Sequence, residues 1–187
     1  MELLYIRQII AGETSRFAYF VDTYKNMAFT VAFRIVNNTA DAEEIVQDAF
    51  VKAYTSLHTF RQDAKFSTWL YKIVVNTALS KTRRKKFLTE VNDTTAIEEI
   101  AIEGIENAYA NLARTEQKRF INEALNEMTM EDSLLLTLFY LQELSMDEIT
   151  EITGIPKENV KVKLHRARKK MYVILNRLLQ ADIKNII

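Results

Sequence analysis

The chain has 187 residues, 48% of them hydrophobic, with 25 basic and 25 acidic side chains and no cysteine. So much apolar surface excludes a globally disordered chain, and the lack of cysteine excludes disulfides and thiolate metal sites. The two histidines, His58 and His165, lie far apart with no carboxylate pattern around them, so we expect no metal and no cofactor. With three glycines and one proline, the sequence predicts an all-α fold.

The sequence also argues against a membrane protein and against an enzyme. It has no run of about eighteen apolar residues, which predicts no direct membrane insertion. The first residues lack the basic segment of a signal peptide, so we expect a cytoplasmic protein. It has no glycine-rich phosphate loop, no nucleophile paired with a base and no metal-ligand spacing, so we expect no catalysis.

The net charge is zero, yet the charges are unevenly distributed along the chain. Residues 1–86 hold thirteen bases and eight acids, and residues 157–170 hold seven bases and one acid. Residues 87–113 hold six acids and no base, and residues 114–156 hold three bases and nine acids. Because a phosphate backbone responds to local potential, the two basic blocks are compatible with nucleic-acid binding.

The first domain is predicted to span residues 1–86 as helices. Apolar residues at helical spacing predict a first helix from about Glu13 to Val36. After a break at residues 37–39, with Thr39 as the expected N-cap, comes a helix with a continuous apolar stripe. Residues 61–65 read as a loop, and Ser67 or Thr68 is expected to cap a third helix that ends in the basic run 81–86.

The second helix has a polar face opposite its apolar stripe. From the pattern alone, simple solvation explains this face, and a docking surface for a partner is the alternative. The side chains that define the face are Asp41, Glu44, Gln47 and Asp48.

The residues 87–113 predict an acidic linker, and a second domain is predicted over 114–187. Ser145 and Glu148 have the spacing of a capping box, which predicts a short helix from Met146 to Thr153. Gly154 suits the left-handed turn that ends a helix, and Pro156 suits the start of the next one.

Two helices joined by such a turn predict a helix-turn-helix, whose second helix enters the major groove of DNA. Val160, Leu164, Ala167 and Met171 form the inward stripe of that second helix. A soluble basic helix face is the alternative interpretation. The side chains predicted to face outward are Lys157, Lys161, Val162, His165, Arg166 and Lys169.

The first domain contains a separate signal for unpaired bases. A basic stretch that contains the loop is surrounded by four aromatic residues, Phe60, Phe66, Trp69 and Tyr71. Aromatic rings beside Lys and Arg side chains can stack on unpaired nucleotide bases. The alternative is that Phe66 and Trp69 belong to the hydrophobic core.

Two long segments resemble a known family. The run Asp41-Ala42-Glu43-Glu44-Ile45-Val46-Gln47-Asp48-Ala49-Phe50, followed by Phe60-Arg61 and by Phe66-Ser67-Thr68-Trp69-Leu70-Tyr71-Lys72-Ile73 with Asn76, resembles region two of extracytoplasmic-function (ECF) sigma factors. Leu144 to Ile149 and Val160 to Arg168 resemble region four. The order and spacing agree over nearly the whole chain. The chain departs from the family pattern at Met128-Thr129, Glu158-Asn159 and Val162, which leaves the promoter sequence open.

The resemblance implies three binding surfaces. Asp41, Glu44, Gln47 and Asp48 would dock on the β′ clamp helices of core RNA polymerase, and the β flap would be a further contact. The upstream, minus-thirty-five promoter element would be read by Lys157, Lys161, Val162, His165, Arg166 and Lys169. The minus-ten element would be bound and melted by Phe60, Arg61, Asp63, Lys65, Phe66, Thr68, Trp69, Lys72, Asn76, Arg83 and Arg84.

The resemblance further implies control by an anti-sigma partner. A stand-alone helix-turn-helix regulator, which would bind its operator as a dimer without polymerase, is the alternative function. The acidic linker is either a solvated tether or a segment that folds back onto a basic face and masks it.

Overall fold

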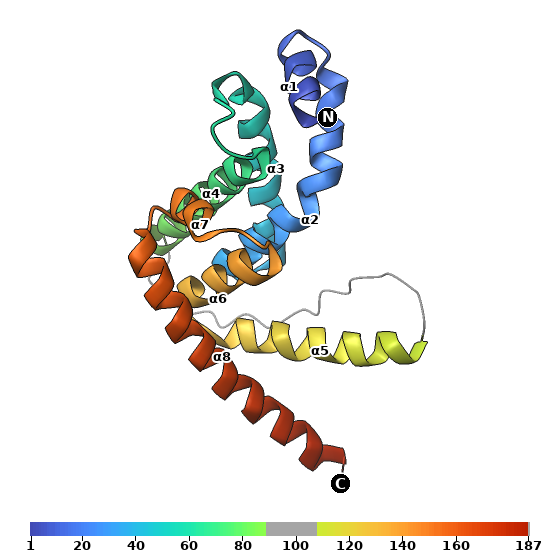
Figure 1. Ribbon diagram of the computed structural model, residues 1–187, viewed down its shortest axis with the longest axis vertical. Helices are drawn as coiled ribbons and strands as arrows, with labels where there is room; N and C mark the ends of the chain where they lie inside the picture. The colour runs from blue at the N-terminus through green and yellow to red at the C-terminus, as the bar shows by residue number, and fades with distance from the viewer. Residues whose placement is uncertain (89–107, 187) are drawn as a thin grey trace.

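The computed structural model describes residues 1–88 and 108–186, and all regular structure in this part is helical (Figure 1). The predicted linker falls largely outside the described residues, and so does the masking role considered for it. Short 3₁₀ turns cover Thr14–Arg16 and Leu57–Thr59, and a π turn covers Thr137–Leu141. The helices are α1 (Glu2–Ile10), α2 (Phe17–Val36), α3 (Thr39–Thr55), α4 (Phe66–Leu88), α5 (Ala108–Glu127), α6 (Met130–Leu136), α7 (Met146–Thr153) and α8 (Lys157–Ile186).

The first half is a bundle in which α2, α3 and α4 pack against one another. The apolar stripe of α3 is buried as predicted at Ala42, Ile45, Ala49, Phe50 and Ala53. The short helix α1, which sequence reasoning did not predict, joins the bundle through Ile6 and Ile9. Burial of these stripes removes apolar surface from water, which is the main force that holds the bundle together.

Three predicted helix starts were wrong by a few residues. The first long helix, α2, begins at Phe17, after a 3₁₀ turn, instead of near Glu13. Asn38, not Thr39, caps α3, and its side chain accepts a 2.9 Å hydrogen bond from the Asp41 amide. Helix α4 begins at Phe66, so Ser67 and Thr68 lie in its first turn.

The second half contains the predicted helix-turn-helix. Ser145 and Glu148 form the predicted capping box at the start of α7. Gly154 ends α7 with a φ of 72°, a left-handed conformation that glycine adopts without strain. Helix α8 then begins at Lys157, one residue after Pro156. The predicted inward stripe of α8 is confirmed at Val160, Leu164 and Ala167, which are fully buried, whereas Met171 is only partly buried against the core.

The two halves are packed directly against each other. Helix α7 lies on α4, and α6 lies on α2 (Figure 1). The buried side chains of both halves form one continuous hydrophobic cluster, which runs from Ile6 to Ala167. The chain is therefore closed over a shared core, a contact that the predicted division into two domains did not anticipate.

Within the described residues, no helix combines the length and the low polarity that a membrane span requires.

Candidate nucleic-acid and partner interfaces

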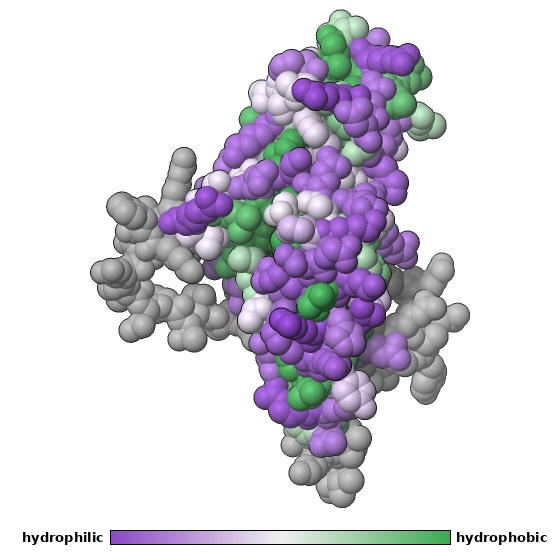
Figure 2. All heavy atoms as spheres, turned by 60° about the vertical axis from the view of Figure 1, so that its left-hand side comes forward, coloured by the Kyte–Doolittle hydropathy of each residue, from purple (hydrophilic) through white to green (hydrophobic). Residues whose placement is uncertain are grey.

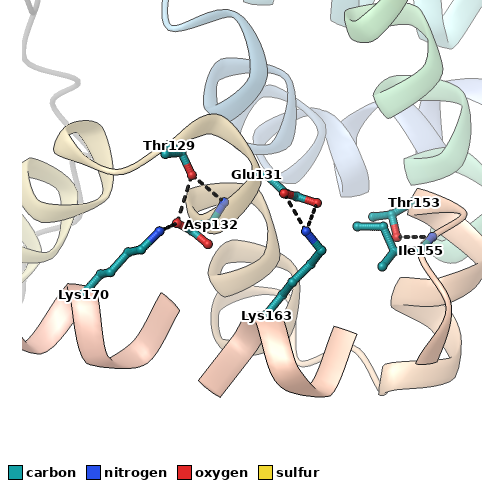
Figure 3. A network of polar contacts seen from close by, with 7 residues as sticks. All are labelled: Thr129, Glu131, Asp132, Thr153, Ile155, Lys163 and Lys170. Atoms are coloured by element: carbon teal, nitrogen blue, oxygen red, sulfur yellow. Dashed lines mark hydrogen bonds and ion pairs between the residues drawn. The ribbon is translucent and has the colours of Figure 1, made fainter. Parts of the chain in front are cut away.

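The basic block of residues 157–170 lies in the first half of α8, but some of its Lys side chains are paired with carboxylates. Lys163 Nζ lies 2.9 Å from a Glu131 carboxylate oxygen, and Lys170 Nζ lies 2.5 Å from Asp132 Oδ2 (Figure 3). Asp132 is buried and also accepts a 2.9 Å hydrogen bond from the Thr129 hydroxyl. Lys163 and Lys170 therefore clamp α8 onto α6.

Five residues of the same helix are left exposed for a ligand. Within the described part of the chain, Lys161, His165, Arg166 and Lys169 are exposed and make no hydrogen bond or ion pair, and Val162 is 48% exposed. These are five of the six residues predicted to read duplex DNA. The sixth, Lys157, forms a 2.8 Å ion pair with Asp147, in which both side chains are more than half exposed.

This exposed face continues beyond the residues that the sequence singled out. His165, Lys169 and Tyr172 line a shallow hollow on α8 together with Arg168 and Val173. Tyr172 is 69% exposed. Its spacing of seven residues from His165 is the one signal that could have placed it on the same helix face. In Figure 2 the lower part of the molecule, where α8 runs, is mainly hydrophilic with isolated hydrophobic side chains.

The aromatic residues beside the loop of the first half belong largely to the core. Phe60 and Phe66 are 9% and 2% exposed, and Thr68 is fully buried. The rings of Phe60, Phe66 and Trp69 lie within 6 Å of one another, at 5.4–5.8 Å between centroids. Trp69 is only partly buried. The core interpretation therefore describes Phe60 and Phe66, whereas Trp69 has a share in both core and surface.

The loop itself is exposed at its polar residues. Arg61, Asp63 and Lys65 all lie on the surface, and Gln62 between them has a φ of 63°. This left-handed residue turns the chain sharply between Phe60 and the start of α4.

The outer face of α4 continues from this loop. Lys72, Asn76 and Arg83 are exposed, and their spacing of four and seven residues puts them on one side of the helix. Arg84 follows Arg83 in the helix, but its side chain lies outside the described residues. The structure thus places two cationic side chains and one amide along a single outward face.

The polar face of α3 is divided between internal pairing and exposure. Lys81 of α4 lies 2.6 Å from Glu44 and 3.1 Å from Asp41. Desolvation opposes the charge of Lys81, but the two carboxylates outweigh it and raise the pKa of the ammonium group. Gln47 and Asp48 are exposed and have no such partner in the described part of the chain.

Polar contacts cross the boundary between the halves. Glu148 Oε1 of α7 lies 3.1 Å from Lys65 Nζ and accepts a 3.2 Å hydrogen bond from the Thr68 hydroxyl. The buried Tyr71 hydroxyl donates a 3.1 Å hydrogen bond to Gln142. Desolvation by itself would raise the pKa of Glu148, but its bonds from Ser145 and Lys65 prevail and lower that pKa to about 2.

A further polar contact across the boundary joins α2 to α5. The Arg34 guanidinium donates two hydrogen bonds of 2.6 Å, one to the side-chain oxygen of Asn122 and one to that of Asn126. Sequence reasoning predicted neither this contact nor that of Glu148, because nothing in a local pattern relates residues about eighty to ninety positions apart.

Neither metal chemistry nor a ligand cavity stands out in the described residues. They contain no group of three or more His, Asp or Glu side chains that could hold a metal ion. The described residues offer three surfaces: a basic helix face on α8, an exposed loop with the outer face of α4, and a polar face on α3. Such surfaces suit macromolecular partners.

Comparison with known proteins agrees with this picture. Sigma-70 region 2 matches residues 20–88, and sigma-70 region 4 matches residues 121–171. The ECF RNA polymerase sigma factor SigW of Bacillus subtilis is 35% identical over 173 residues, which cover 88% of this chain and 91% of SigW. The ECF sigma-E factor of Escherichia coli is 29% identical over 170 residues and 88% of each chain.

Solved structures show the same fold. A chain of the complex of the sigma factor RpoE with the anti-sigma factor NepR from Bartonella quintana matches with a TM-score of 0.69 at 21% identity. The match covers 86% of this chain and 96% of that one. A chain of the complex of CnrH with the cytosolic domain of CnrY matches with a TM-score of 0.63 at 22% identity, over 96% and 97% of the two chains.

A chain with a sigma region 2 bundle and a helix-turn-helix region 4, in which the regular structure of the described residues is helical, is a sigma factor of bacterial RNA polymerase. The chain belongs to the ECF group of RNA polymerase sigma factors. It binds core RNA polymerase and promoter DNA, and it directs promoter-specific initiation of transcription.

Proposed function

We propose that the start of α8 reads the minus-thirty-five promoter element. The observation that carries this proposal is that the basic side chains of this one helix fall into two groups. Lys163 and Lys170 are used to hold α8 on α6, whereas Lys161, His165, Arg166 and Lys169 stay exposed. Arginine and lysine donate to guanine edges and phosphates, and an apolar side chain such as Val162 can contact a thymine methyl group.

The minus-ten element is assigned to the loop and the outer face of α4. Arg61, Lys65, Lys72, Asn76 and Arg83 are exposed and follow one path from the loop along the helix, and Asp63 lies on the same loop. A basic path of this kind suits the backbone of an opened strand, and the partly exposed ring of Trp69 can stack on a base. Phe60, Phe66 and Thr68 are buried, so we propose that they shape the loop and support the base-binding side chains from beneath.

Core polymerase is assigned to the polar face of α3. Gln47 and Asp48 are the exposed contacts, and Lys81 holds Asp41 and Glu44 in place beside them. We place the partner surface on the β′ clamp helices, with the β flap as a second contact for region 4. The division of labour then follows the domains 1–86 and 114–187, with residues 87–113 as the connecting segment.

The remaining features of the function follow from this assignment. We expect a binding protein without catalytic activity, located in the cytoplasm where polymerase and chromosome meet. RpoE of Bartonella quintana was solved with the anti-sigma factor NepR, and we propose that an anti-sigma protein restrains this chain as well.

Run-off transcription tests the proposal. Purified chain and core polymerase are incubated with fragmented genomic DNA from the bacterium that encodes the chain, and transcript starts are mapped. We expect starts that share one upstream element and depend on the added chain. A gel shift without core polymerase distinguishes a sigma factor from a stand-alone helix-turn-helix regulator, because the regulator would bind its operator without polymerase. Starts that do not require the chain would contradict the proposal.

A further inference from the structure

The closed arrangement engages one residue that is assigned to promoter DNA and one buried residue that supports the same surface. Lys65 and Thr68, at the loop and the first turn of α4, both contact Glu148 of α7. Glu148 is held in position by the capping box, because its carboxylate also accepts a 2.8 Å hydrogen bond from the Ser145 amide. A carboxylate fixed in this place offers Lys65 the same kind of charge that a DNA phosphate would offer.

The contact of Arg34 across the boundary is built differently. Arg34 is 9% exposed, and its two hydrogen bonds go to neutral amides instead of carboxylates. Its Nε is buried and has no hydrogen-bond partner in the described part of the chain. Burial lowers the pKa of this guanidinium to about 10. A buried cation without a counter-charge is costly, so this contact stabilises the closed chain less than a guanidinium–carboxylate pair would.

Closure affects the two DNA-binding surfaces unequally. Lys161, His165, Arg166 and Lys169 of α8 remain exposed in the closed chain. Glu148 instead faces the loop that precedes α4. The contact therefore engages Lys65 of the surface for the melted strand, whereas in the described part of the chain no residue of the surface for duplex DNA is engaged in this way.

We propose that Glu148, Asn122 and Asn126 form an intramolecular latch that holds region 4 on region 2 in the free chain, and that Glu148 competes with promoter DNA for Lys65. The competition with DNA rests on the proposed function of the minus-ten surface, whereas the latch itself does not. The neutral amides around Arg34 keep the latch weak enough for a binding partner to open.

Distance measurement between two spin labels tests the latch in the full-length chain. The sequence contains no cysteine, so Thr23→Cys on α2 and Glu151→Cys on α7 introduce the only thiols. Both positions are exposed, and neither forms a hydrogen bond or ion pair in the described part of the chain. Pulsed electron paramagnetic resonance then reports the distribution of distances between the halves.

Three variants test the latch: two should weaken it and one should strengthen it. Glu148→Gln removes the charge but keeps an acceptor for the capping box, which accepts Gln at this position. Asn122→Ala with Asn126→Ala removes both acceptors of Arg34 and places a good helix former in α5. Asn126→Asp gives Arg34 a carboxylate, which bonds a guanidinium more strongly than an amide does. Glu158→Gln, at an exposed position of α8 without a partner in the described part of the chain, is the matched control.

We expect one short distance in the parent chain and in Glu158→Gln. Loss of two hydrogen bonds to a charged group should lower the ratio of closed to open chain about tenfold or more in the double alanine variant. Glu148→Gln should lower it less, and Asn126→Asp should raise it. Long, broad distances in the parent chain, or the same distribution in all variants, would overturn the latch.

Binding of a fluorescent single-stranded thymidine 20-mer tests the competition separately. Glu148→Gln should bind this probe more tightly than Glu158→Gln, and Lys65→Ala should abolish the gain. Equal affinities of the two Gln variants would overturn the competition. Run-off transcription with Lys65→Ala, which should lose activity if the minus-ten assignment holds, shows whether the proposed function has failed instead.

Discussion

Two adjacent lysines of α8 should behave in opposite ways when each is replaced by alanine. Lys169 is exposed and has no partner in the described part of the chain, whereas Lys170 pairs with the buried Asp132. We expect Lys169→Ala to weaken DNA binding and leave folding stability unchanged. We expect Lys170→Ala to lower stability and to affect DNA binding much less.

The loss of folding stability expected for Lys170→Ala lies between two known limits. Exposed ion pairs contribute roughly 0.2–1 kcal/mol, and breaking a fully buried pair costs about 3–5 kcal/mol. The Lys170 side chain is 55% exposed and that of Asp132 is 11% exposed, and Asp132 keeps its hydrogen bond from Thr129. Discounting for this exposure gives a loss of about 1–2 kcal/mol, and each kcal/mol lowers the melting temperature by roughly 2–4 °C in a chain of this size.

Thermal unfolding of the free chain, followed by circular dichroism, measures the first effect. Binding of the holoenzyme to one promoter duplex over a series of salt concentrations measures the second. Each phosphate contact contributes about −0.9 to the slope of log K against log salt, so Lys169→Ala should reduce the slope by about one. If Lys170→Ala reduced the slope equally and melted at the parent temperature, the assignment of Lys170 to α6 would be refuted.

Four further outcomes follow from the structure. Replacing Asp48 by Lys should weaken core binding in a competition assay with unchanged helix content, and parental affinity would contradict the α3 surface. Arg166→Ala should lose about 1–3 kcal/mol and relax preference at one promoter position; transcription of every promoter at the parental rate would contradict its role. Gly154→Ala should cost about 1–2 kcal/mol in thermal unfolding, because its φ of 72° strains a side chain although a Cβ would meet nothing within 4 Å; a parental melting temperature would be inconsistent with this. Because the folded pKa of Glu148 lies at about 2, below its ordinary 4.5, its stabilising effect is present above pH 4.5 and is lost as the pH falls towards 2. A titration followed by carbon-13 NMR should show the low pKa of Glu148 in the parent chain and a higher pKa of Glu148 in Lys65→Gln. A Glu148 pKa near 4.5 in the parent chain would contradict this prediction.

Local signals predicted the helix-turn-helix well. The capping box of Ser145 and the left-handed Gly154 depend on residues within a few positions of each other, so the sequence was sufficient to place α7. The cap of α3 was misplaced by one residue because Asn38 and Thr39 are both good caps, and only the Asp41 amide decides between them. Helix α1 was missed because its buried side consists of Ile6 and Ile9 alone, too few for a periodic pattern.

The long-range contacts could not be predicted from the sequence. Lys169 and Lys170 are neighbours of one residue type, and only the position of α6 determines which one is paired. The same holds for Lys65 and Arg34, whose partners come from the other half of the chain. Periodicity shows which side of a helix is apolar, but it contains no information on which polar residues of distant helices meet.

Helix α8 connects the residues proposed to read the promoter with the contact between α8 and α5. Its 30 residues form one unbroken helix, which corresponds to a rod about 45 Å long. The reading residues lie in its first half, while Arg177 and Asp182, farther along, bind Glu127 and Arg119 of α5. If the first half of this rod docks in the major groove as proposed, a tilt of the rod there would also displace its contact with α5 at the other end.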